Sequence, residues 1–61
     1  MDDDLTYDIE MRYKSDDWTP LSHGVCCEKC AVAEMEGAAK RLPGRHFRIV
    51  ERRVTRIVKE I

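Results

Sequence analysis

The feature that most constrains the fold is a strict alternation of apolar and polar residues from Leu5 to Lys14. A period of two is typical of a β-strand with one buried face and one solvated face. The next residues, Ser15-Asp16-Asp17, favour a turn, and segment 18–21 then indicates a short second strand that returns antiparallel to the first. Pro20 cannot donate a hydrogen bond to a neighbouring strand, so we expect this second strand at an edge of the sheet.

A helical period replaces the alternation from about Cys26 to Leu42, where apolar residues recur every three or four positions. Side chains with this spacing lie on one face of a helix, and we expect that face to pack on the sheet. Pro43-Gly44 ends the pattern, as is typical after a helix. The predicted apolar stripe consists of Cys27, Ala31, Met35, Ala38 and Leu42.

The C-terminal segment from His46 to Ile61 fits two structures. Phe47 and Ile49 alternate with polar residues, which favours a third strand, bent or bulged near Arg52-Arg53. The segment also carries one apolar face of a helix, and a short strand followed by a C-terminal helix is the alternative. That helical face would consist of Val50, Val54, Ile57, Val58 and Ile61.

These elements predict an α+β fold of the order β-β-α-β, with a three-stranded antiparallel sheet in the order 2-1-3 and one helix packed on one face. The alternative is β-β-α-β-α. A chain of 61 residues forms a single domain, 1–61, with one thin core, and we expect the acidic residues 1–4 to be a disordered leader. The predicted core consists of Tyr7, Ile9, Met11, Trp18, Leu21, Cys30, Ala31, Met35, Ala38, Leu42, Phe47 and Ile49.

Charge is divided unevenly along the chain. Residues 1–39 contain ten acidic and three basic side chains (net −7), whereas residues 40–61 contain eight basic and two acidic ones (net +6). We expect internal neutralisation, in which Asp8 and Glu10 on the first strand pair across the sheet with Arg48, Arg52 or Arg56. The other interpretation is that the basic C-terminal segment contacts the phosphates of a nucleic acid.

The three cysteines lie close together in sequence, at Cys26, Cys27 and Cys30. So compact a cluster cannot form a framework of stapling disulfides. Together with His23 and His46 it offers the ligand types of a tetrahedral zinc site, although a regular helix would not turn all three thiols toward one ion. The cluster also suits small thiols packed near a helix start, or a redox dithiol. We expect no cofactor, with zinc as the alternative.

Three segments of the chain resemble small uncharacterised proteins encoded by bacteriophages and prophages: Tyr7-Asp8-Ile9-Glu10-Met11-Arg12-Tyr13, Asp17-Trp18-Thr19-Pro20-Leu21-Ser22 and Leu42-Pro43-Gly44-Arg45-His46-Phe47-Arg48-Ile49-Val50. An alanine-rich charged helix joins the last two. The resemblance covers most of the chain and implies a phage accessory role, but it transfers no catalytic or binding residue. The cysteine cluster departs from the pattern, which usually has Thr, charged residues and Ala there.

The sequence contains no Ser/His/Asp order, paired-carboxylate signature or phosphate-binding glycine loop, so we expect no enzymatic activity. We expect a protein-interaction module that binds and modulates a host protein or forms a homodimer. A nucleic-acid-binding protein and a small zinc-binding module are the alternatives. No apolar stretch is long enough to cross a bilayer, so we expect no membrane contact and a cytoplasmic location. The residues expected to contact the partner are Val50, Arg52, Arg53, Val54, Arg56 and Val58.

Overall fold

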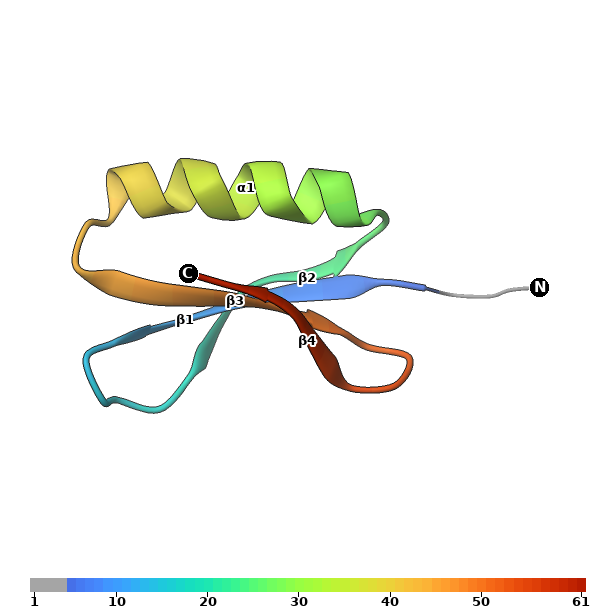
Figure 1. Ribbon diagram of the computed structural model, residues 1–61, viewed down its shortest axis with the longest axis horizontal. Coiled ribbons are helices and arrows are strands. Elements are labelled where there is room, and N and C mark those ends of the chain that lie inside the picture. The colour runs from blue at the N-terminus through green and yellow to red at the C-terminus, as the bar shows by residue number, and fades with distance from the viewer. Residues whose placement is uncertain (1–4) are drawn as a thin grey trace.

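The computed structural model describes residues 5–61 as one sheet of four antiparallel strands with a single helix on one face (Figure 1). The predicted leader at residues 1–4 lies outside the described residues. In chain order the elements are β1 (Tyr7–Tyr13), β2 (Thr19–Val25), α1 (Glu28–Arg41), β3 (Arg45–Glu51) and β4 (Arg56–Glu60). The prediction of an α+β fold with one helix and an antiparallel sheet is confirmed.

The number of strands differs from the prediction. The sheet order is β2-β1-β3-β4, so the expected order 2-1-3 is confirmed for the first three strands, but a fourth strand is added beside β3. The three-stranded sheet and the alternative C-terminal helix are therefore both wrong. The cause is a turn at residues 52–55, where Thr55 adopts a left-handed backbone conformation with a φ of 54° and the chain reverses direction.

The core lies between α1 and one face of β1 and β3. These two strands pair without a register shift, which places Ile9 opposite Ile49 and Met11 opposite Phe47. Ile9, Ile49 and Met35 are completely buried, and Met35 belongs to the helical stripe that the sequence predicts. The alternation of β1 and the helical period of α1 thus bury the residues that their patterns indicate.

Trp18 and Cys30 are not in the core, although both are predicted there from the sequence. Trp18 is half-buried on the opposite face of the sheet, and Cys30 is exposed at the start of α1. The buried face of α1 consists of Ala31, Met35 and Ala38, and Cys30 lies outside it. Three other predicted core residues are only half-buried at its border: Met11, Leu21 and Leu42.

Both edge strands are irregular. On β4 the pairing moves from Ile49↔Lys59 to Val50↔Ile57, which leaves Val58 as an extra residue, and the pairing of β2 with β1 shifts twice. Pro20 lies on the edge strand β2, as the sequence predicts. Bulges and proline at sheet edges disturb the row of backbone groups that another strand would need for pairing. The faces of this sheet are consequently better suited to binding than its edges.

None of the helices formed by residues 5–61 has the length and the apolar character that crossing a membrane requires.

Candidate functional site

Two parts of the structure are candidate functional sites. One is a cluster of thiols between β2 and α1, and the other is the sheet face opposite α1. The thiol cluster consists of Cys26, Cys27 and Cys30. The open face, as we call the second feature, is formed by residues of β1 and β3, with Trp18 lying against it: Asp8, Glu10, Arg12, Arg48 and Val50.

The three thiols converge because the helix starts later than its sequence pattern indicates. Cys27 is the N-cap of α1 and has an extended backbone, with φ −150° and ψ 156°. Its Sγ accepts a hydrogen bond from the backbone N–H of Cys30 at 3.2 Å and lies 2.8 Å from the Sγ of Cys30. All three sulfur atoms lie within 4.8 Å of one another. The expectation that they could not point toward one ion assumed a regular helix from Cys26, and the extended cap removes that obstacle.

The thiols of Cys27 and Cys30 differ in acidity. Hydrogen bonds from the side chain and the backbone N–H of Cys30 lower the pKa of Cys27 below its ordinary value, because both favour the thiolate. The same side-chain hydrogen bond and the nearby negative charge of Cys27 raise the pKa of Cys30 to about 11. Cys27 is therefore the more acidic thiol of the pair.

The structure does not bring the two histidines to the thiol cluster. His23 is on β2 with its Nδ1 3.5 Å from Oδ2 of Asp8, and His46 is on β3 opposite Arg12. Among residues 5–61, no His, Asp or Glu side chain joins the three thiols as a further ligand. The five candidate zinc ligands thus separate into one group of three cysteines and two histidines outside that group.

Trp18 organises the centre of the open face. The guanidinium carbons of Arg12 and Arg48 lie 4.7 Å and 4.3 Å from the centroid of a Trp18 ring. Both distances are within the range of cation–π attraction. Nε of Arg48 also donates to Oε1 of Glu10 at 2.6 Å, so one guanidinium bridges the acidic strand and the aromatic ring. The sequence signal for this placement was weak, because Trp18 stands between a turn and a short strand, and its face depends on which residue of β1 pairs with Thr19.

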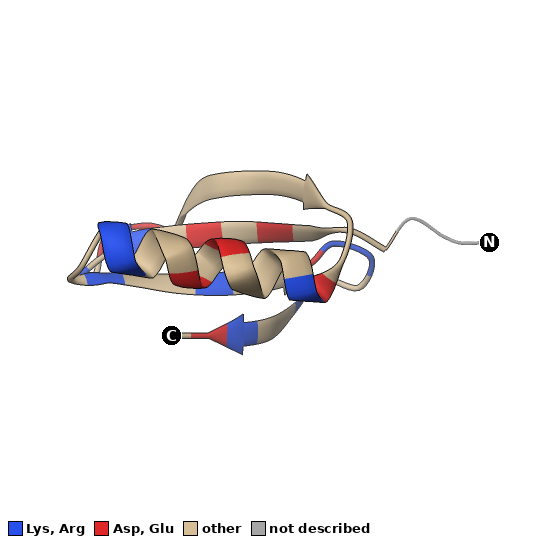
Figure 2. Ribbon diagram, turned by 90° about the horizontal axis from the view of Figure 1, so that it is seen from above, with Lys and Arg blue, Asp and Glu red and all other residues tan. Residues whose placement is uncertain are grey.

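Three of the eight basic side chains in the C-terminal segment form ion pairs with carboxylates of the described residues. Arg48 pairs with Glu10, and Nη1 of Arg52 lies 3.2 Å from Oδ2 of Asp8. The predicted pairing of first-strand acids with these arginines is confirmed. Figure 2 shows the acidic positions of β1 beside basic positions of β3. A third arginine, Arg56, pairs with a residue outside β1: its Nε lies 2.7 Å from Oε1 of Glu51.

The residues that the sequence predicts to contact a partner do not form one surface. Val50 is half-buried on the open face, whereas Val58 packs against the core on the helix side. Val54 lies in the turn at residues 52–55 together with Arg52 and Arg53. The three valines would share one face only on a continuous strand, and the turn and the bulge of β4 break that alternation.

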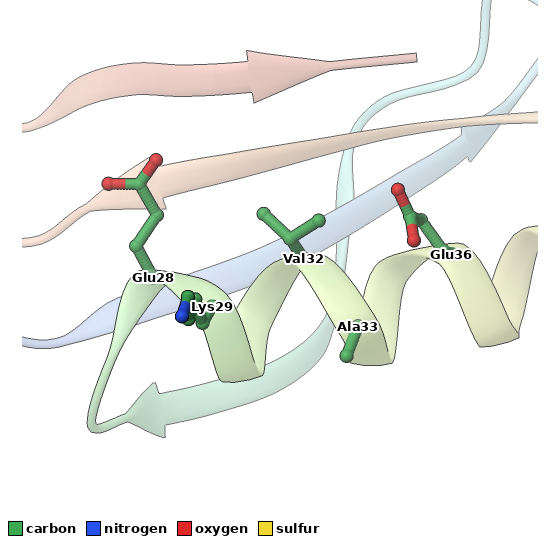
Figure 3. A pocket seen from close by; sticks show the side chains of 5 residues that line it. All are labelled: Glu28, Lys29, Val32, Ala33 and Glu36. Carbon is green, nitrogen blue, oxygen red and sulfur yellow. The ribbon is translucent and has the colours of Figure 1, made fainter.

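A shallow groove of about 550 Å³ runs along α1 and is lined by Glu28, Lys29, Val32, Ala33 and Glu36. Figure 3 shows Glu28, Val32 and Glu36 on the side of the helix toward β3 and β4. Four of the five lining residues are exposed and only Val32 is half-buried, so the groove does not enclose a ligand.

No protein-family model, curated protein or solved structure shows a significant match to this chain.

Proposed function

We propose that this chain is a non-enzymatic protein-interaction module that binds its partner through the open face. The observation that carries the proposal is the position of Trp18, held by Arg12 and Arg48 on a sheet face that α1 does not cover. Trp and Arg are the residue types that most often dominate the binding energy of protein interfaces. Because the sequence resembles proteins encoded by bacteriophages, we propose that the partner is a protein of the bacterial host.

The packing of the open face supports binding at low entropic cost. Trp18 is half-buried and contacts two guanidinium groups, so its side chain is largely ordered before a partner arrives. Nε of Arg12 is buried without a hydrogen-bond partner among the described residues. The guanidinium of Arg12 lies over the Trp18 ring, 4.7 Å from its centroid. A surface that is already ordered loses less conformational entropy on binding.

The shape of the sheet favours a face over an edge as the binding surface. The turns that join β1 to β2 and β3 to β4 both bend toward the side opposite α1, so the open face lies between them (Figure 1). The bulges on β2 and β4 disfavour strand addition at either edge. A partner that contacts Trp18 would also reach the two turns, which include Arg52 and Arg53.

A protein partner fits the charges of the open face better than a nucleic acid does. Arg48 of the open face and Arg52 of the adjoining turn are already paired with carboxylates of β1. Phosphate binding would have to replace these ion pairs, which reduces the gain from counterion release. A face that mixes paired charges with an aromatic ring is typical of a polar protein interface.

The proposal is tested by comparing capture from a bacterial lysate by the wild-type chain, by Trp18→Ala and by Tyr13→Ala as the matched control. Tyr13 is an exposed aromatic residue that also has two cations near its ring. The Tyr13→Ala variant therefore also loses an aromatic ring with neighbouring cations, but at a different position from Trp18. We expect Trp18→Ala to lose a protein that Tyr13→Ala retains, with both variants folded by circular dichroism.

Two results would contradict the proposal: equal retention by all three proteins, and retention of nucleic acid alone that falls steeply with salt. Self-association is examined in the same series by sedimentation at about 100 μM, since a second copy of the chain is also a protein partner. A homodimer that Trp18→Ala dissociates would agree with the open face as the interface.

A further inference from the structure

We propose that Cys26, Cys27 and Cys30 form a three-thiolate site for a soft metal ion, Cu(I). The inference is independent of the proposed interaction through the open face. The first observation is that the Sγ atoms of the three cysteines lie within 4.8 Å of one another. Metal–sulfur bonds of about 2.3 Å in a planar arrangement separate the sulfur atoms by roughly 4 Å. Small side-chain rotations therefore suffice to bring all three sulfurs around one ion.

The positions of the three cysteines keep the sulfurs near that geometry. Cys26 and Cys27 directly follow β2, which ends at Val25, and Cys30 is in the first turn of α1. The extended cap at Cys27 directs its thiol toward Cys30 and fixes it by a hydrogen bond from the Cys30 backbone. Ligands held between two regular elements need less reorganisation than ligands on a long loop.

The choice of ion follows from the number and kind of ligands. Thiolates select soft ions such as Cu(I), and structural zinc sites almost always have four protein ligands. This cluster has three sulfurs, and no His, Asp or Glu of residues 5–61 joins it. Cu(I), a monovalent ion with a closed d shell, can be fully coordinated by three thiolates. Zn²⁺ would need a fourth ligand, which here would come from solvent.

Neither histidine joins the three thiols to complete a zinc site. Cys26 and Cys27 follow the end of β2 that pairs with Tyr7, while His46 pairs with Arg12 near the other end of β1. Five residues of strand separate these positions by roughly 17 Å. His23 is close in sequence, but its Nδ1 faces the Asp8 carboxylate on the open face.

The exposure of the cluster provides a path for the ion. Cys26 and Cys30 are exposed and Cys27 is half-buried, so an ion can reach the sulfurs without opening the core. A site of this kind can exchange its ion with another thiol ligand, because one side of the metal remains open to an incoming group. Transfer of the ion between thiols changes no oxidation state.

The test measures the competition for Cu(I) between the fully reduced protein and a chromophoric Cu(I) chelator under anaerobic conditions. Thiol counting first verifies three free thiols per chain, which excludes a disulfide. We expect the wild-type chain to withdraw one Cu(I) per chain from the chelator. Each of Cys26→Ser, Cys27→Ser and Cys30→Ser should weaken binding by roughly tenfold or more.

Cys27→Ser is the most informative variant, because serine is a preferred N-cap and preserves the start of α1 while removing the soft ligand. His23→Ala is the matched control and should bind Cu(I) like the wild type. The proposal is overturned if the chain removes no Cu(I) from the chelator, if Cys26→Ser binds as tightly as the wild type, or if His23→Ala loses as much affinity as the cysteine variants. One equivalent of Zn²⁺ held more tightly than Cu(I) would also overturn it.

Discussion

Arg48 and Glu10 lie opposite each other on β3 and β1, and Nε of Arg48 donates to Oε1 of Glu10 at 2.6 Å while the same guanidinium covers Trp18. This single side chain links the internal neutralisation of charge to the proposed binding surface. Both partners are about three-quarters buried, with exposed fractions of 25% and 26%. The pair therefore has less contact with solvent than an ordinary surface ion pair.

We expect Glu10→Gln to lower the free energy of unfolding by about 1 kcal/mol, because it removes the charge from a partly buried hydrogen bond. Glu36→Gln, which neutralises an exposed carboxylate on α1, should change it by less than about 0.5 kcal/mol. Urea denaturation measures both variants. Equal effects of the two substitutions would show that the pair contributes nothing specific.

Thr55→Gly should raise the free energy of unfolding by about 1 kcal/mol. The φ of Thr55 is 54°, a conformation that a β-branched residue adopts only with strain and glycine adopts readily. Val54→Gly in the same turn is the control, since the φ of Val54 is not positive, and it should give no such gain. A stabilisation by Val54→Gly that matches Thr55→Gly would contradict the left-handed turn. Thermal unfolding compares the two.

Ile9→Asp should abolish cooperative unfolding, because Ile9 is completely buried opposite Ile49 and its place in the core offers no partner for a carboxylate. Ile57→Asp is the matched change on an exposed strand position and should leave a cooperative transition. Differential scanning calorimetry distinguishes the two. A folded Ile9→Asp protein would mean that the register of β1 is wrong.

Alkylation of the reduced protein should distinguish Cys27 from Cys30 by pH. The pKa of Cys27 is lowered by its hydrogen bonds from Cys30, so its thiolate persists, and its reaction with iodoacetamide continues, below the pH at which an ordinary thiol is protonated. The pKa of Cys30 is about 11, so its alkylation should rise only in strongly alkaline solution. Peptide mapping after short exposures assigns each rate. The reverse order of reactivity would contradict the cap geometry.

Most of the framework follows from local patterns in the sequence. The alternation around Ile9 and the helical spacing around Met35 each predict a buried face, and both residues are completely buried in the structure. The pairing of Glu10 with Arg48 was also predictable, because acids on one strand and bases on another favour neighbouring positions in the sheet. Each of these sequence patterns extends over several residues, so the prediction does not depend on the backbone conformation of any single residue.

The features that could not be predicted depend on single backbone choices. The turn at residues 52–55 lacks glycine, proline and asparagine, so the sequence predicts a bend there but not the chain reversal that makes a fourth strand. The convergence of the thiols depends on a helix that begins at Glu28 and leaves Cys27 as an extended cap, which a helical pattern from Cys26 conceals. The face of Trp18 depends on the pairing of Met11 with Thr19, which places Trp18 beside Arg12 and away from the core. Each of these is decided by the packing of the whole sheet.

The most direct test of the open face as the binding surface is the fluorescence of Trp18 during titration with the captured partner protein. Trp18 is the only tryptophan of the chain, and a partner without tryptophan, or with its tryptophans replaced by phenylalanine, leaves it as the sole reporter. The account predicts that the emission of Trp18 shifts and its quenching by iodide decreases, with saturation at a fixed stoichiometry. A saturated complex in which emission and quenching are both unchanged would contradict it.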